Sequence, residues 1–156
     1  MKNIEQIKKA ITSNRETIAI AESVTSGVLQ TAFAAANGKE KFYRGGITTY
    51  SIGQKKFHHL LVDPIKAQDC NSVSKKVAEE MALGVCKLFS SDFGIGITGY
   101  ATPIKESHFK MFCYFALTYR GKIILSKKIT AQNGDAKDVQ MFYAQEVLKE
   151  FGSYLN

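Results

Sequence analysis

Two kinds of apolar pattern alternate along this 156-residue chain. Residues 3–13 carry apolar side chains at helical spacing, whereas residues 17–21 form a short β-rich segment typical of a strand buried on both faces. The same alternation of helix and strand continues through residues 28–36 and 42–51. Alternating segments of this kind predict an α/β fold whose first strands run parallel.

The second half of the chain continues the alternation and ends in a hairpin and a helix. Helices are expected at residues 54–61, after Ser74 and at residues 135–154, and strands at residues 93–98, 110–119 and 122–130. Leu88 and Phe142 are among the apolar helix residues expected to face the core. A hairpin adds one antiparallel strand. We therefore expect a single domain over residues 1–156, a three-layer α/β/α sandwich around a mixed, mostly parallel sheet of about five strands.

Composition excludes several classes of protein. The longest apolar stretches fall far short of the roughly 20 residues that cross a bilayer, and the polar N-terminal segment does not resemble a signal peptide. Cys70, Cys86 and Cys113 are widely spaced, which predicts free thiols and no metal site. These features predict a cytoplasmic protein without a membrane partner.

The net charge of +7 favours an anionic partner, but its distribution argues against nucleic acid. The lysines occur in scattered doublets, and no RNA-binding or helix-turn-helix signature accompanies them. We interpret most of them as solvated surface residues. The remaining candidate is a phosphorylated small molecule, which would benefit from the positive field.

Three polar loops follow the predicted central strands, at residues 22–27, 50–55 and 98–103. In open α/β sheets, ligands bind at the carboxyl ends of the strands, so these loops form the predicted site. Ser23 lies between a buried strand and a helix start, where N–H groups of residues 25–27 could bind an oxyanion or a phosphate. The alternative is that Ser23 or Thr25 simply caps the helix.

A serine nucleophile needs a base, and Lys55 is a better candidate for it than any of the three histidines. A lysine that is shielded from water has a lowered pKa and accepts a proton near neutral pH. On local pattern alone, however, Lys55 beside Lys56 also fits a surface residue.

Several motifs of this chain resemble those of one family. Residues 21–27 read AESVTSG, which resembles the AESCTGG motif of the CinA C-terminal domain family, the nicotinamide-nucleotide amidases. Residues 42–51 read FYRGGITTYS and precede Lys55, similar to the family's FRGGVVTYS-x-x-x-K. Residues 71–82 and 96–101 extend the resemblance in the same order over nearly the whole chain.

The resemblance implies hydrolysis of the carboxamide of nicotinamide mononucleotide to the carboxylate and ammonia, with no metal or other cofactor. It implies Ser23 as nucleophile, Lys55 as general base and Tyr50 as an assisting hydroxyl. The substrate-binding positions that it implies are Thr25, Ser26, Gly27, Gly46, Ser51, Thr98 and Gly99. It also implies a small-molecule nucleotide as substrate and a homodimer as the assembly.

The chain departs from the family pattern in its loops. Ser26 stands where the family has glycine, Val24 stands where it usually has cysteine, and the loop after Thr98 lacks the family's glycines. Loops poor in glycine approach a phosphate less closely. The alternative hypothesis is therefore a catalytically inactive module of the same fold that binds a nucleotide or a protein partner.

Overall fold

The computed structural model describes residues 3–50 and 72–156, and the five strands in this part of the chain form one mixed sheet. The strands are β1 (Ile18–Glu22), β2 (Tyr43–Thr48), β3 (Phe93–Gly99), β4 (Met111–Tyr119) and β5 (Lys122–Ala131), in the order β2-β1-β3-β4-β5. β1 pairs in parallel with both β2 and β3, whereas β4 is antiparallel to β3 and to β5. The predicted mixed sheet with one reversed strand is confirmed.

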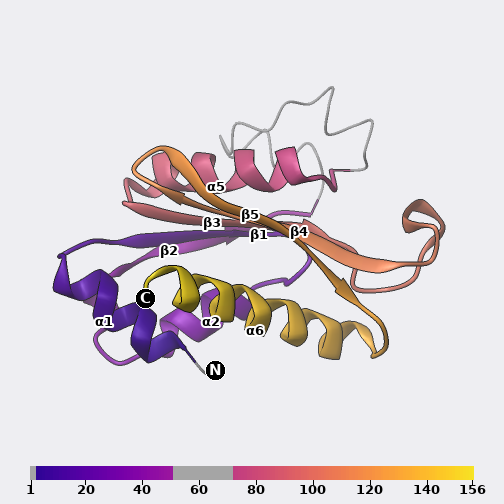
Figure 1. Cartoon of the computed structure of the whole chain (residues 1–156), viewed down its shortest axis with the longest axis horizontal. Helices are drawn as coiled ribbons and strands as arrows, with labels where there is room; N and C mark the ends of the chain where they lie inside the picture. Colours follow the sequence, from indigo (N-terminus) through magenta and orange to yellow (C-terminus); the bar gives the residue numbers. More distant parts are fainter. Residues whose placement is uncertain (1–2, 51–71) are drawn as a thin grey trace.

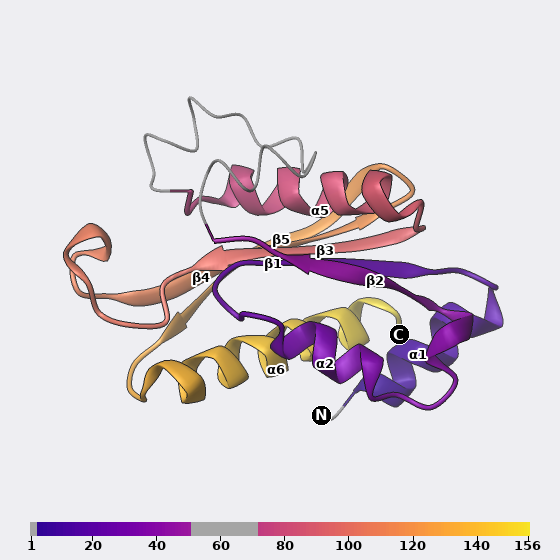
Figure 2. The same cartoon turned by 180° about the vertical axis from the view of Figure 1, so that it is seen from behind.

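Helices cover both faces of this sheet, as the two views in Figures 1 and 2 show. α1 (Ile4–Ser13), α2 (Val28–Ala34) and α6 (Ala136–Tyr154) lie on one face, and α5 (Lys75–Phe89) lies alone on the other. Two short 3-10 helices, Lys39–Lys41 and Lys105–Ser107, lie in connecting segments. The three-layer sandwich is confirmed, and the helix predicted at residues 54–61 lies outside the described residues.

The two faces of the sheet are packed differently. Large apolar side chains fill the face under α1, α2 and α6, where Ile20, Ile95 and Phe151 are fully buried. On the other face α5 lies close to the sheet at Gly96, which has no side chain. A Cβ atom at that position would be 2.3 Å from the carbonyl oxygen of Ala78. Such close contact fixes α5 in place and holds its first turn near the carboxyl ends of the parallel strands.

Two of the residues expected to face the core do not. Leu88 is 42% exposed and Phe142 is 37% exposed, so both predictions are wrong. Leu88 follows Met81 and Val85 along the buried stripe of α5 but lies in the last turn of that helix, and Phe142 lies at the side of the buried stripe of α6. Helical spacing alone does not decide burial at such positions.

Two of the three cysteines lie within the described residues. Cys86 and Cys113 are buried free thiols, and burial raises the pKa of each. Cys70 lies outside the described residues, so the prediction for it is untested.

In residues 3–50 and 72–156 no helix has the length and apolar character to cross a membrane.

Candidate functional site

The carboxyl ends of β1, β2 and β3 bring three hydroxyl residues into one row. The N–H of Ser23 donates to the carbonyl oxygen of Ile97 (3.1 Å), and the N–H of Thr49 donates to that of Glu22 (2.8 Å). These bonds extend the parallel register of β1 with both neighbours by one residue. Ser23 therefore lies between Thr49 on one side and Thr98 on the other, and we call these three residues the hydroxyl row.

The hydroxyl row belongs to the α5 face of the sheet. Successive strand residues alternate between the faces, and Ala21, two residues before Ser23, packs against α5. Thr98 donates its hydroxyl to the carbonyl oxygen of Ser72 (2.7 Å), which fixes the segment leading into α5. Ser74 then caps the helix by accepting from the N–H of Val77 (3.1 Å). The row and the first turn of α5 thus share one edge of the sheet.

Glu22 points to the opposite face and organises the turn that carries Ser23. Its side chain is fully buried and accepts from the Thr25 hydroxyl (2.6 Å) and from the N–H groups of Leu29 and Gln30 (both 2.9 Å). The Gln30 amide also donates to Glu22 (2.9 Å) and to the Thr48 hydroxyl (2.8 Å). A carboxylate on the first N–H groups of a helix is stabilised by the helix dipole. Glu22 therefore anchors α2 to the ends of β1 and β2.

The three predicted binding residues of the loop after β1 are largely engaged within the protein. Thr25 is fully buried, and its hydroxyl donates to Glu22. The N–H of Ser26 donates to the carbonyl oxygen of Ser23 (3.2 Å), so this donor is already paired. Ser26 has a φ of 47° and Gly27 a φ of 95°, the left-handed region that favours glycine. Contact of these residues with a substrate remains a prediction.

Two of the predicted binding glycines, Gly46 and Gly99, lie where the backbone has no room for a side chain. A Cβ atom at Gly46 would lie 2.6 Å from the carbonyl oxygen of Ile20, and one at Gly99 would lie 2.4 Å from that of Phe112. Both positions therefore require glycine for packing, whatever they contribute to a ligand.

Of the remaining predicted residues, Tyr50, Ser51 and Lys55, only Tyr50 lies within the described residues. Tyr50 is 91% exposed, and a ring this exposed packs against almost nothing. Ser51 and Lys55 lie outside the described residues. The proximity of Lys55 to Ser23, and the assisting hydroxyl of Tyr50, stay predictions.

A hollow of about 320 Å³ lies away from the hydroxyl row, along the outer side of α2. Small and apolar side chains of α2 line it together with Met141 of α6, and it reaches Ser26 and Gly27. Few polar side chains in this lining could bind a ligand. In the described ranges, no three His, Cys, Asp or Glu side chains are grouped so that they could hold a metal ion.

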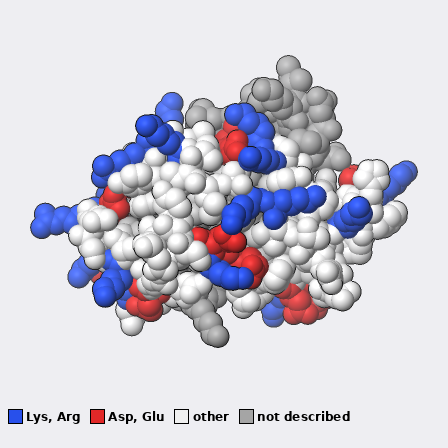
Figure 3. Space-filling model, in the orientation of Figure 1, with Lys and Arg blue, Asp and Glu red and all other residues white. Residues whose placement is uncertain are grey.

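Basic side chains form no single stripe on the face drawn in Figure 3, where blue groups are spread over the surface with red groups among them. Several lysines are paired locally, as Lys127 is with Glu150 and Lys149 with Glu146. The positive charge therefore supplies a general field over this face.

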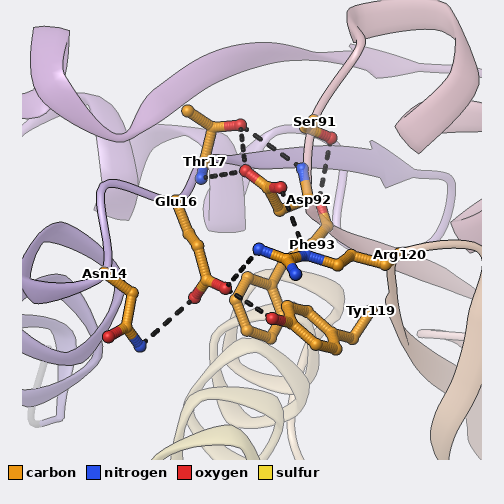
Figure 4. Close-up of polar contacts among 8 residues, drawn as sticks. All are labelled: Asn14, Glu16, Thr17, Ser91, Asp92, Phe93, Tyr119 and Arg120. Atoms are coloured by element: carbon orange, nitrogen blue, oxygen red, sulfur yellow. Dashed lines mark hydrogen bonds and ion pairs between the residues drawn. The ribbon is translucent and has the colours of Figure 1, made fainter.

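A second polar cluster lies at the amino-terminal edge of the sheet (Figure 4). Glu16, only 5% exposed, accepts from the Tyr119 hydroxyl (2.5 Å) and from the Arg120 guanidinium (3.3 Å). Asp92 accepts from the backbone N–H of Thr17 (2.9 Å) and lies 3.7 Å from Arg120. These groups satisfy one another and join three distant segments, which is the arrangement of a structural cluster.

Comparison with known proteins places the chain in a family. A model of the CinA C-terminal domain matches residues 1–155. The chain belongs to the CinA C-terminal domain family. A CinA-like protein of Sulfurihydrogenibium sp. is 30% identical over 153 residues, which are 97% of this chain and 38% of that protein. A CinA-like protein of Picosynechococcus sp. is 39% identical over 98 residues, 63% of this chain and 23% of that protein.

Solved CinA-superfamily structures have the same fold. The structure from Enterobacter cloacae superimposes with a TM-score of 0.90 at 25% identity, covering 99% of this chain and 91% of that one. The competence damage-inducible protein A structure from Klebsiella pneumoniae has a TM-score of 0.91 at 24% identity, covering 99% of this chain and 95% of that one. The aligned part of this chain thus amounts to well under half the length of these two curated CinA-like relatives but spans almost the whole of the solved chains.

Glu22 and Thr49 are not among the site residues predicted from the sequence. The role of Glu22 could have been predicted, because a carboxylate at the end of a fully buried strand needs hydrogen-bond donors. The first turn of the next helix supplies such donors. Thr49 could not have been predicted in this way. Its place beside Ser23 depends on the strand order, which the sequence does not state.

Proposed function

We propose that this chain is a serine amidohydrolase that acts on the carboxamide of nicotinamide mononucleotide, with Ser23 as its nucleophile. The position of Ser23 is the main support for the proposal. It lies in the middle of the hydroxyl row, at the carboxyl edge of three parallel strands and beside the start of α5. This edge is where α/β sheets bind ligands, and the family resemblance assigns the nucleophile to the same residue.

In the proposed reaction, the Ser23 hydroxyl oxygen attacks the carboxamide carbon and its proton passes to Lys55. The tetrahedral intermediate collapses with loss of ammonia, which takes the proton back from Lys55. Water then hydrolyses the acyl-enzyme to the carboxylate and frees Ser23. One amide and one water are consumed, and one carboxylate and one ammonium ion are formed.

The described residues support this chemistry by holding Ser23 in place. Its N–H is bonded to β3, and its carbonyl oxygen accepts from Ser26, so the backbone at the nucleophile is fixed on both sides. Behind it, the buried carboxylate of Glu22 ties the turn to α2. A nucleophile on rigid backbone loses little freedom on reaching the transition state.

One observation favours the alternative, a module that binds a nucleotide without turning it over. Among the N–H groups of residues 25–27 that were predicted to bind an oxyanion, that of Ser26 already donates to the carbonyl oxygen of Ser23, so it is not available to a developing oxyanion. An oxyanion would need other donors. Both the amidohydrolase and the binding module would bind a nucleotide, but only the amidohydrolase would turn it over.

An ammonia-release assay on the purified chain tests the proposal. The substrates are nicotinamide mononucleotide, nicotinamide riboside and nicotinamide, and the proteins are wild type, Ser23→Ala and Lys55→Met. We expect release from the mononucleotide by wild type, none by Ser23→Ala, and a decrease of roughly 10²-fold or more with Lys55→Met. All variants should retain the wild-type Tm within a few degrees.

Ser13→Ala is the matched control, because Ser13 is an exposed serine on α1 whose hydroxyl donates only to the Lys9 carbonyl within that helix. It should be fully active. A wild type that is silent with every amide, yet is stabilised thermally by the mononucleotide, supports the binding module instead. Activity that survives in Ser23→Ala contradicts the serine mechanism.

A further inference from the structure

The Thr49 hydroxyl is buried without a hydrogen-bond partner in the described part of the chain. Thr49 is 2% exposed, and its Oγ1 is one of two buried side-chain oxygens in residues 3–50 and 72–156 that lack a partner; the other is the Ser126 Oγ. Burying a hydroxyl without a partner destabilises a fold, and native proteins keep few such groups. Of the two, only the Thr49 hydroxyl lies beside the candidate nucleophile, whereas Ser126 lies on β5, three strands away from β1.

The other buried threonines show that this state is unusual in the fold. Each of them has a partner for its hydroxyl: Thr17 with Asp92, Thr25 with Glu22, Thr98 with Ser72, and Thr118 with Ala82. Thr49 differs from them in its place, because it is the hydroxyl next to Ser23 on the β2 side.

The backbone of Thr49 is fixed although its hydroxyl is not. Its N–H donates to the carbonyl oxygen of Glu22 (2.8 Å), which continues the ladder between β1 and β2. Neighbouring strands lie about 4.8 Å apart, so one rotation of the Ser23 side chain about its Cα–Cβ bond is enough to carry Oγ toward Thr49. A threonine hydroxyl both donates and accepts.

We infer that Thr49 is a positioning residue for Ser23, and this inference rests on the proposed function. Its hydroxyl donates to Ser23 Oγ in the reactive orientation, which leaves the Ser23 proton directed to the base. The bond also stabilises the negative charge that develops on Oγ as the proton leaves. The partner that Thr49 lacks in the resting structure is thus the nucleophile in its reactive rotamer.

Two substitutions separate this role from a structural one. Thr49→Val keeps the shape of the side chain and removes the hydroxyl, whereas Thr49→Ser keeps the hydroxyl. We expect Thr49→Val to lower kcat for ammonia release from nicotinamide mononucleotide by about 10²-fold with KM unchanged. Thr49→Ser should stay within about 3-fold of wild type, and the Tm of Thr49→Val should equal or exceed that of wild type, because an unpaired buried polar group is removed.

A second readout does not depend on the substrate. A fluorophosphonate reacts with an activated serine and releases fluoride, and peptide mass spectrometry locates the modified residue. The rate at which it labels Ser23 should fall in Thr49→Val by a factor similar to that in kcat. Ser126→Ala is the matched control, since it removes the other unpaired buried hydroxyl on β5, away from the site. It should raise the Tm and leave both rates unchanged.

The outcomes are distinguishable. A Thr49→Val protein with wild-type kcat and labelling rate overturns the positioning role while the proposed function stands. A Thr49→Val protein with a lowered Tm and unchanged kcat shows that the hydroxyl is structural and also overturns the role. A wild type with neither ammonia release nor labelling of Ser23 overturns the proposed function, and the role of Thr49 with it.

Discussion

The two ends of β1 each hold a buried glutamate, and the two glutamates have different partners. Glu16, before the strand, contacts Tyr119 and Arg120, which lie 103 and 104 residues further along the chain. Glu22, at the end of the strand, contacts Thr25, Leu29 and Gln30, all within eight residues. The first joins distant segments of the fold, and the second shapes one local turn.

The two ends also differ in how completely their polar groups are paired. At the amino-terminal edge, Glu16, Thr17 and Asp92 all have partners in the cluster of Figure 4. At the carboxyl edge, Glu22 is fully paired on the α2 side, but Thr49 has an unpaired hydroxyl on the α5 side within the described residues. The polar groups of one edge thus stabilise the fold, whereas the α5 side of the other edge keeps one hydroxyl unpaired beside Ser23.

The largest effect on stability is expected at Glu22. Glu22→Ala leaves a buried hydroxyl and two helix N–H groups without their acceptor, and each unpaired buried group costs about 1–3 kcal/mol. We expect the free energy of unfolding to fall by about 3 kcal/mol or more, measured by urea denaturation. Glu146→Ala is the control, because Glu146 makes only a local ion pair with the exposed Lys149 and should change stability by less than about 0.5 kcal/mol. Equal losses in the two variants would contradict the anchoring role of Glu22.

A smaller effect, visible only at high pH, is expected at the amino-terminal edge. The hydrogen bond to Glu16 is the main cause that raises the pKa of the Tyr119 hydroxyl, followed by burial and by the charge of Glu16. An unfolded tyrosine ionises near pH ~10. Since the folded pKa is the higher one, the stabilisation is complete below about pH 10 and is lost as the pH rises above it.

Tyr119→Phe tests this dependence. Between pH 9 and pH 11 (about one unit either side of the unfolded pKa), the urea midpoint of wild type should fall more steeply than that of Tyr119→Phe. Burial also raises the pKa of Tyr43, to about 12, with a further contribution from Glu22, but this residue is the same in both proteins. If the urea midpoints of the two proteins fell equally with rising pH, ionisation of the Tyr119 hydroxyl would not contribute to the loss of stability at high pH.

Much of the fold could be predicted because it depends on local patterns. β1 is five buried residues in a row, and α5 combines a Ser74 cap with regular apolar spacing, so both elements are recognisable in the sequence. The strand order was not predictable, because it depends on which strands pair across the sheet. Helical spacing likewise placed Leu88 and Phe142 in the core, although Leu88 is exposed in the last turn of α5 and Phe142 at the side of the buried stripe of α6.

The candidate site was predicted as three loops, and its internal geometry was not. Ser23 and Thr98 do share one row, as expected for the carboxyl ends of neighbouring strands. The row also includes Thr49, which only the register of β1 and β2 places beside Ser23. Lys55 lies outside the described residues, so its part in the site rests on the resemblance alone.

The smallest effect is expected from relieving backbone strain, which occurs near both ends of β1. Ser26 has a φ of 47° and Arg15 a φ of 56°, and both side chains are exposed. A left-handed conformation costs an L-residue about 1–2 kcal/mol, and the extra freedom of glycine in the unfolded chain offsets part of that cost. We expect Arg15→Gly to raise the free energy of unfolding by about 0.5 kcal/mol.

Ser26→Gly should give a similar gain, because the hydroxyl that it removes makes only long contacts, 3.4 Å to the Ser23 carbonyl oxygen and 3.5 Å to the Gln140 amide. Ser26→Ala keeps the Cβ atom and the strain, so it should give no gain. Urea denaturation of the three variants measures the comparison. A gain in Arg15→Gly alone would mean that the Ser26 hydroxyl stabilises the turn through Ser23 and Gln140. In that case the serine that stands in place of the family's glycine contributes to holding the nucleophile.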